Sequence, residues 1–328
     1  MSATPIPAPA TRPEGPSPTG ATVGKVDPAW SLSDKVGVSM AWAAGLLLCV
    51  IAAAIVLYML YRGIQYVSAD LLVEHPAKDL DQSKGGGFLD PIIGTFILTI
   101  IGIAVAAPVG VGIAVWLSEY GRPSGLARAV ESGIEIVAGI PSIVLAIFGL
   151  LVFSQQAFGF LSFTAGGDAV FGRSFLIAGI MMSLIALPLI VGSTREALLA
   201  IPAHVREASY ALGKDRASTI RRVLLPASRS GVATGISLGM GRIIGDTAIV
   251  VVLLGGLLLE PTSDVPVVGT LTGTGGTLTS YVYNNSPTGE GNAPDKAYAA
   301  AFVLLIVVII LNFLVDRISR RRKAEWTT

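Results

Sequence analysis

Two charged residues lie four positions apart in an otherwise apolar stretch, residues 230–259. If the stretch is a membrane-spanning helix, Arg242 lies about 16 Å deep, near the bilayer centre, and Asp246 follows one turn later on the same face. A guanidinium offers a planar fork of donors that matches two oxygens of an anion such as phosphate. The spacing therefore predicts an anion-binding position in which Asp246 holds Arg242 or bonds a protonated anion, or else a purely structural ion pair.

A second segment, residues 195–229, has the pattern of a helix, a glycine turn and another helix. Gly213 suits a left-handed helix cap, and the second helix is predicted over residues 216–225, ending at Pro226. Three apolar residues share one face of the first helix: Ala208, Ala211 and Leu212. An apolar face on a loop in water indicates docking to a partner protein.

Composition places these segments in a membrane protein. Of the 328 residues, 52% are hydrophobic and 14% charged, and the mean hydropathy is +0.70, whereas soluble domains carry roughly 25% charged residues. A soluble enzyme is therefore not expected. The net charge of +1 gives no reason to bind nucleic acid. With one cysteine, Cys49, and two histidines far apart, the sequence predicts neither a disulfide framework nor a metal site.

Six membrane-spanning helices are predicted, in an all-α membrane domain covering residues 36–316. Five windows free of Asp, Glu, Lys and Arg reach the roughly 20 residues that a crossing needs, and residues 230–259 supply the sixth. The five windows are residues 36–61, 91–118, 136–167, 174–194 and 297–315. A disordered proline-rich tail is expected over residues 1–35 and a basic tail over residues 317–328.

The distribution of positive charge predicts the orientation. Seventeen Lys and Arg residues fall on the side of both termini and of residues 195–229, against five on the other side. Positive connections stay in the cytoplasm, so both termini and this loop are predicted to be cytoplasmic in a multi-pass protein of the bacterial cell membrane. Within the spans, the glycines at 231, 235 and 239 predict close helix packing, and Pro141 predicts a kink.

The loop resembles the EAA loop of ABC importer permeases, which docks onto a cytoplasmic ATPase. The resemblance is carried by Glu207-Ala208-Ser209, by Gly213 six residues after the glutamate, and by Leu225-Pro226. Two positions depart from the consensus: Ser209 stands where Ala is usual, and Val223 where Ile is usual. The resemblance implies that this loop receives the ATPase.

Further motifs resemble the phosphate-specific (Pst) importer permeases, and the C-terminal span resembles the PstA type more than the PstC type. The motifs are Gly94-Thr95, Ser118-Glu119-Tyr120, Ala138-Gly139-Ile140-Pro141-Ser142 and Gly241-Arg242-Ile243-Ile244-Gly245-Asp246. The resemblance implies the type I permease fold and phosphate passage past Arg242 and Asp246. Family members usually carry Glu at the position of Asp246, so the partner of this shorter acid is an open point.

No G-x-x-x-x-G-K-[ST] motif occurs, so the chain cannot be its own ATPase. The resemblance implies that a separate ATPase dimer binds ATP and Mg²⁺, and that the chain itself holds no cofactor. It also implies a second, PstC-like permease and an extracytoplasmic phosphate-binding protein as partners. Two alternatives remain open at this point: a permease for another oxyanion such as sulfate or molybdate, and an ion-coupled secondary transporter.

Overall fold

The computed structural model describes residues 32–79, 81–121, 124–162, 170–256, 258–260 and 266–321. Within these ranges the chain is helical, with two isolated β-bridges and no strand. The chain divides into two compact units, residues 1–55 and 56–328, which are described separately. The predicted tails lie outside the described residues up to position 31 and beyond position 321.

The described part of the first unit is a single helix. Helix α1 spans Leu32–Tyr66, so it begins four residues earlier than the span predicted from residue 36. Its side chains are exposed throughout residues 32–55, although nearly all of them are apolar. Lipid tails are as apolar as leucine, so such a helix needs no cover from the rest of the chain when it crosses a bilayer.

Helices α3, α6 and α13 of the second unit, together with α1, are long and apolar enough to cross a membrane. Helix α3 covers Leu89–Val115 and continues as a π-helical turn, Trp116–Tyr120. Helix α6 covers Phe175–Leu199, and α13 covers Pro294–Arg321. Because α13 continues to Arg321, the first basic residues of the predicted tail lie on the helix itself.

A bent pair of helices supplies a fifth candidate span. Helix α4 covers Gly125–Gly139 and α5 covers Ser142–Phe153, with an angle of 105° between them. Pro141 lies at the bend, where its missing N–H and fixed φ prevent the helix from continuing. The predicted interruption at Pro141 is present, but it is a break between two helices rather than a simple kink within one span.

The sixth predicted span is also two helices. Helix α9 covers Leu225–Gly245 and α10 covers Ala248–Leu253, with a break at Asp246 and Thr247. The predicted continuous span over residues 230–259 is therefore wrong. Helix α9 is rich in Gly and Ser, and it is not among the helices apolar enough to cross a membrane by composition alone.

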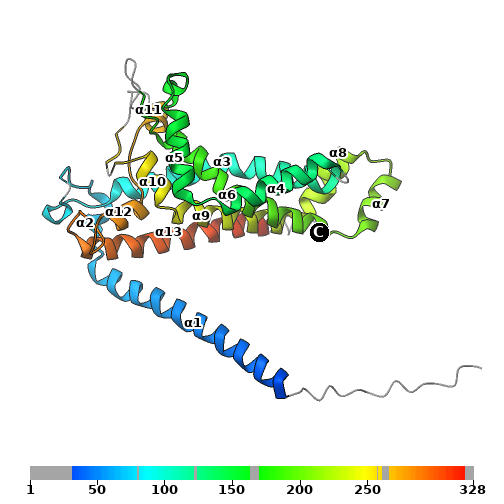
Figure 1. Ribbon diagram of the computed structural model, residues 1–328, viewed down its shortest axis with the longest axis horizontal. Coiled ribbons are helices and arrows are strands. Elements are labelled where there is room, and N and C mark those ends of the chain that lie inside the picture. Colours follow the sequence, from blue (N-terminus) through cyan, green and yellow to red (C-terminus); the bar gives the residue numbers. More distant parts are fainter. Residues whose placement is uncertain are drawn as a thin grey trace, which may run out of the picture. The chain divides into compact units, whose positions relative to one another are not determined.

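The short helices lie at the two ends of the second unit (Figure 1). Helices α7, Ala203–Ala211, and α8, Arg216–Thr219, lie at one end. At the other end are α2, Ala69–Val73, α11, Pro266–Thr272, and α12, Leu278–Asn284. The long helices run between these ends, so successive connections alternate sides, as a multi-pass topology requires.

Helix α6 lies at the centre of the second unit, packed against α3 and α9. It is the most buried candidate span, with 61% of its apolar window inside. Helices α6 and α9 approach closely because glycines of α9 face α6. A Cβ at Gly231 would lie 2.2 Å from the Ala197 Cβ, and a Cβ at Gly235 would lie 3.1 Å from the Ile190 Cα. The predicted packing role of these glycines is confirmed.

Candidate functional site

Arg242 lies in the last turn of α9, on a face that the described residues of the second unit leave exposed. Every fourth residue along this face is exposed: Ser230, Thr234, Leu238 and Arg242. A Cβ at Gly241 or at Gly245 would meet no atom within 4 Å, so the space beside Arg242 is open. If this face lies within the membrane, as predicted, a charged side chain that faces lipid would be costly, so the face is expected to meet water or another subunit.

The Arg242 guanidinium forms no ion pair or hydrogen bond with any residue that the structure describes. Its position favours the charge nonetheless, since the free carbonyl groups at the end of a helix carry partial negative charge. All the donors of the guanidinium remain available to an external acceptor.

Asp246 does not pair with Arg242 on a continuous helix, so the predicted one-turn spacing on a shared face is wrong. Helix α9 ends at Gly245, and Asp246 has extended backbone angles, φ −82° and ψ 129°. Its buried carboxylate accepts a hydrogen bond from the backbone N–H of Ile249 at 3.0 Å, and its carbonyl oxygen accepts one from the Thr279 hydroxyl at 3.4 Å. The acid therefore fixes the break between α9 and α10.

A helix that breaks inside a span leaves backbone groups without their helical partners. Such irregular backbone is tolerated at membrane depth only where it is buried in protein or lines a water-filled cavity. Discontinuous helices of this kind form the ion and substrate sites of many transporters. The break at Asp246 and the free guanidinium of Arg242 thus lie together at a position suited to binding an anion.

The segment of residues 203–219, hereafter the coupling segment, has the predicted helix, glycine turn and helix. Helix α7 begins after Pro202, and Gly213 adopts φ +74°, the left-handed region that glycine enters without steric cost. The Gly213 N–H donates to the Tyr210 carbonyl at 2.9 Å, and the Lys214 N–H to the Ser209 carbonyl at 3.2 Å. The predicted turn at Gly213 is therefore confirmed.

The predicted docking face of the coupling segment is free in this chain. Four residues of the EAA resemblance and of the apolar face are exposed, namely Glu207, Ala208, Ala211 and Leu212, whereas Ser209 of the resemblance is buried. Leu212 is 81% exposed, which is costly in water for a side chain of this size unless a partner covers it.

The predicted end of the second helix at Pro226 is wrong. A π-helical turn, Ile220–Leu224, joins α8 directly to α9, whose first two residues are Leu225 and Pro226. A proline is tolerated in the first turn of a helical segment, where its missing N–H removes no obligatory bond. The coupling segment is consequently continuous with the helix that carries Arg242.

An ion pair that sequence reasoning missed holds the coupling segment to α3. Arg206 Nε and Nη2 both donate to Glu119 Oε1, at 3.2 and 3.1 Å, and the Glu119 side chain is only 7% exposed. Two further donors of Arg206 reach backbone carbonyls at the end of α6, Leu198 at 2.8 Å and Ile201 at 2.7 Å. The two partners are 87 positions apart, so their spacing gave no signal, although Glu119 belongs to the Ser118-Glu119-Tyr120 motif.

A second ion pair lies near the same end of the unit, between Arg195 of α6 and Glu131 of α4, at 2.5 Å. It occupies Glu131, one of two glutamates at the start of the bent helix pair. One ion pair thus joins the coupling segment to α3 and the other joins α6 to α4, both at the end of the unit that carries the coupling segment.

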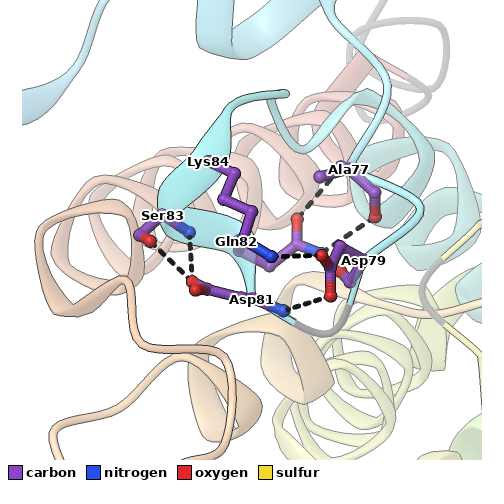
Figure 2. Close-up of polar contacts among 6 residues, drawn as sticks. All are labelled: Ala77, Asp79, Asp81, Gln82, Ser83 and Lys84. Atoms are coloured by element: carbon purple, nitrogen blue, oxygen red, sulfur yellow. Dashed lines mark hydrogen bonds and ion pairs between the residues drawn. The ribbon is translucent and has the colours of Figure 1, made fainter.

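The opposite end of the unit is held by a folded loop before α3. Figure 2 shows the Gln82 side chain bonded to the backbone of Ala77 and Asp79. The Lys296 ammonium donates to three carbonyls of this loop, those of Gln82, Gly85 and Gly86, at 2.6 to 2.8 Å. Hydrogen bonds from the Ser83 hydroxyl and N–H lower the pKa of Asp81 below its usual range.

Beside this loop is a cavity of about 700 Å³. Its wall includes Lys78, Arg173, Gly255 and Glu260. Nearby, α12 is anchored by Tyr281, whose ring is fully buried against Phe88, and burial raises the pKa of the Tyr281 hydroxyl to about 12. The cavity and the coupling segment therefore lie at opposite ends of the helix bundle that carries Arg242.

A family model described as "Binding-protein-dependent transport system inner membrane component" matches residues 106–324. The match covers the ion pair at Glu119, the coupling segment and Arg242.

Among curated relatives, the Probable ABC transporter permease protein YqgH of Bacillus subtilis is 29% identical over 299 residues, covering 89% of this chain and 93% of the relative. A phosphate transport system permease protein PstC of Xylella fastidiosa is 32% identical, covering 71% and 72%. A phosphate transport system permease protein PstA 1 of Mycobacterium tuberculosis is 31% identical, covering 74% of each chain. Relatives of both the PstA and the PstC type are thus found at similar identity.

Among solved structures, a bacterial ABC transporter involved in the import of the acidic polysaccharide alginate has a chain that superposes with a TM-score of 0.58 at 17% identity. The superposition covers 88% of this chain and 98% of that one. At this identity the likeness concerns the fold alone, which is that of type I permeases, as predicted.

Proposed function

The chain belongs to the family of binding-protein-dependent transport system inner membrane components and is a PstA/PstC-like permease subunit of an ABC importer, and we propose that its cargo is inorganic phosphate. The permease is the subunit through which cargo passes. The residues of the site therefore bear on which cargo passes and on how ATP hydrolysis in another subunit drives its passage.

The free guanidinium of Arg242 is the observation that carries the proposal. It lies on the uncovered face of α9, beside a helix break, with no partner among the described residues. A guanidinium binds a tetrahedral oxyanion through two parallel N–H···O bonds, and it remains charged at every physiological pH. Phosphate at neutral pH supplies the oxygens and the negative charge that complete such a site.

Asp246 supports this site indirectly. Its carboxylate bonds the Ile249 N–H, so it holds the first turn of α10 against the end of α9 and keeps the break open beside Arg242. We assign Asp246 the task of shaping the site, and Arg242 the task of binding the anion.

Helix α9 connects the anion site to the coupling segment without interruption. From Leu225 to Arg242 the helix rises about 26 Å, at 1.5 Å per residue. A displacement of α7 and α8 by an ATPase would therefore tilt or shift the helix that carries Arg242. This arrangement suits alternating access, in which one rigid element moves relative to a central binding site.

The proposed assembly contains this permease, a second homologous permease, two ATPase subunits that bind ATP and Mg²⁺, and an extracytoplasmic phosphate-binding protein. The exposed Leu212 and Ala208 provide the contact with the ATPase. The uncovered α9 face provides the contact with the second permease, so the translocation path would lie between the two.

The alternative cargo is another oxyanion, since sulfate and molybdate present similar tetrahedral oxygens. Phosphate is favoured because relatives at 31% and 32% identity are named phosphate permeases. The test is to reconstitute the complete importer in proteoliposomes and measure ATP hydrolysis and uptake with phosphate, sulfate and molybdate, each presented with its binding protein. We expect phosphate alone to stimulate ATP hydrolysis and to be taken up. Stimulation by sulfate but not by phosphate would show that the cargo is sulfate and not phosphate.

A further inference from the structure

Helix α7 has too little hydrophobic contact to fix its own position. It contains nine residues, and Ser209 is the only buried one among them. Helices shorter than about 12 residues are marginal in water, and most helical stability in proteins comes from packing of an apolar face. Polar contacts must therefore determine where α7 lies.

The main polar contact joins α7 to the end of α3. Arg206 donates two hydrogen bonds to one oxygen of Glu119, and two further donors bond the Leu198 and Ile201 carbonyls at the end of α6. Glu119 is almost fully buried, so solvent screens this ion pair far less than a surface pair. A buried pair is strongly unfavourable to break, because separation leaves an uncompensated charge.

Two further contacts reinforce the same junction. The Arg216 guanidinium of α8 lies over the ring of Tyr120, 5.2 Å from its centroid. The hydroxyls of Ser209 and Thr219 bond each other at 2.8 Å and so join α7 to α8. Both halves of the coupling segment are thus attached to the π-helical turn that ends α3, through adjacent residues of one motif.

We infer that Glu119 is a positioning residue that makes α3 move together with the coupling segment during transport. The inference rests on the proposed function, since it assumes that an ATPase displaces this segment. Helix α9 follows the segment because it is covalently continuous with it. Helix α3 follows because the Glu119–Arg206 pair and the Tyr120–Arg216 contact attach it, so two spans rather than one respond to ATP hydrolysis.

Neutralising Glu119 tests the inference. Glu119→Gln keeps the size of the side chain and an acceptor oxygen but removes the charge that binds Arg206. In proteoliposomes containing the complete importer and phosphate-loaded binding protein, we expect phosphate uptake per ATP hydrolysed to fall at least about tenfold, because a buried ion pair is lost. The ATPase should remain bound, because the exposed residues around Leu212 are unchanged and the Ser209–Thr219 hydrogen bond and the Arg216–Tyr120 contact still hold the coupling segment.

Two variants serve as controls. Glu119→Asp retains the carboxylate and should recover part of the coupling, which a role in packing alone would not produce. Glu196→Gln makes the same chemical change at an exposed glutamate near the end of α6, and its phosphate uptake per ATP hydrolysed should equal that of the wild type. A double-mutant cycle with Arg206→Gln should show strong non-additivity in uptake per ATP.

The inference is overturned if Glu119→Gln transports as much phosphate per ATP as the wild type. It is equally overturned if that variant loses the ATPase, because the pair would then merely fold the docking surface. If phosphate is not the cargo, the result differs, because the wild-type importer itself would not take up phosphate. In that case the effect of Glu119→Gln is still measured by comparing, in the variant and in the wild type, the rate of ATP hydrolysis with cargo-loaded binding protein and the rate without it.

Discussion

The Asp246 carboxylate accepts a hydrogen bond from the Ile249 N–H at 3.0 Å, across the break between α9 and α10. The acid is buried and Arg242 is exposed, although the two residues are only four positions apart. Their roles therefore separate: one residue shapes the backbone of the site, and the other presents its charge to the space beside the helix.

If Asp246 acts as a cap, its acceptor oxygen matters more than its charge. Asp246→Asn keeps that oxygen, so we expect uptake within about threefold of the wild type and little loss of thermal stability in detergent. Asp246→Ala leaves the Ile249 N–H without its partner and should cost about 1 to 2 kcal/mol, with a clear fall in uptake. A well-folded Asn variant without transport would show instead that the charge itself is required.

Substitutions at Arg242 should affect transport and spare stability. Arg242→Ala removes an exposed group with no partner among the described residues, so the melting temperature should hardly change while phosphate uptake is lost. Arg242→Lys should recover uptake only in part, since an ammonium on a flexible stem cannot reproduce the two-oxygen fork. Arg128→Ala on the exposed start of α4 is the matched control. Full uptake by Arg242→Ala would exclude Arg242 as the anion site.

The sequence predicted the local features whose causes lie in neighbouring residues. The left-handed turn at Gly213 depends on residue types within a few positions and is confirmed, and the interruption at Pro141 lies where it was predicted. The close packing of Gly235 is also confirmed, although its partner Ile190 lies on another helix. The continuous helix through Asp246 was wrong because apolar composition does not register a break that is stabilised by Thr279 from another helix.

Tertiary polar contacts could not be predicted for a related reason. Glu119 and Arg206 are each ordinary charged residues near a loop predicted to be cytoplasmic, and only the fold brings them within 3.2 Å. The helix end predicted at Pro226 failed because a π-helical turn before the proline absorbs the missing N–H, an arrangement with no sequence signal of its own.

Gly213 provides a test of the coupling segment that does not touch the spans. A Cβ at this position would meet no atom within 4 Å, so any effect of substitution comes from the backbone conformation at φ +74°. Gly213→Val should strain the turn by about 1 to 2 kcal/mol and abolish uptake, with weaker retention of the ATPase on purification. Gly213→Asn, which tolerates this region, is the control and should retain most of the uptake. Equal behaviour of the two variants would mean that the turn geometry is unimportant.

The orientation predicted from the positive charges can be tested with two single cysteines, after Cys49 has been replaced. Ala217 and Thr288 are both exposed, and they lie at opposite ends of the second unit. An impermeant thiol reagent applied to intact cells should label a cysteine at position 288 and spare one at position 217. Labelling of position 217 alone would reverse the orientation and place the coupling segment outside the cell.

Ser209 stands where related loops usually carry alanine, and its hydroxyl is buried against that of Thr219. Ser209→Ala should therefore destabilise the coupling segment by about 1 to 3 kcal/mol, because the Thr219 hydroxyl loses its partner while remaining buried. Thr219→Val should have a similar effect for the same reason. The double variant removes both polar groups at once and should be closer to the wild type than either single variant, a coupling that thermal unfolding of the purified importer can measure. If the two single effects simply add, the hydroxyl pair does not join α7 to α8, and the position of α7 depends on Arg206 alone.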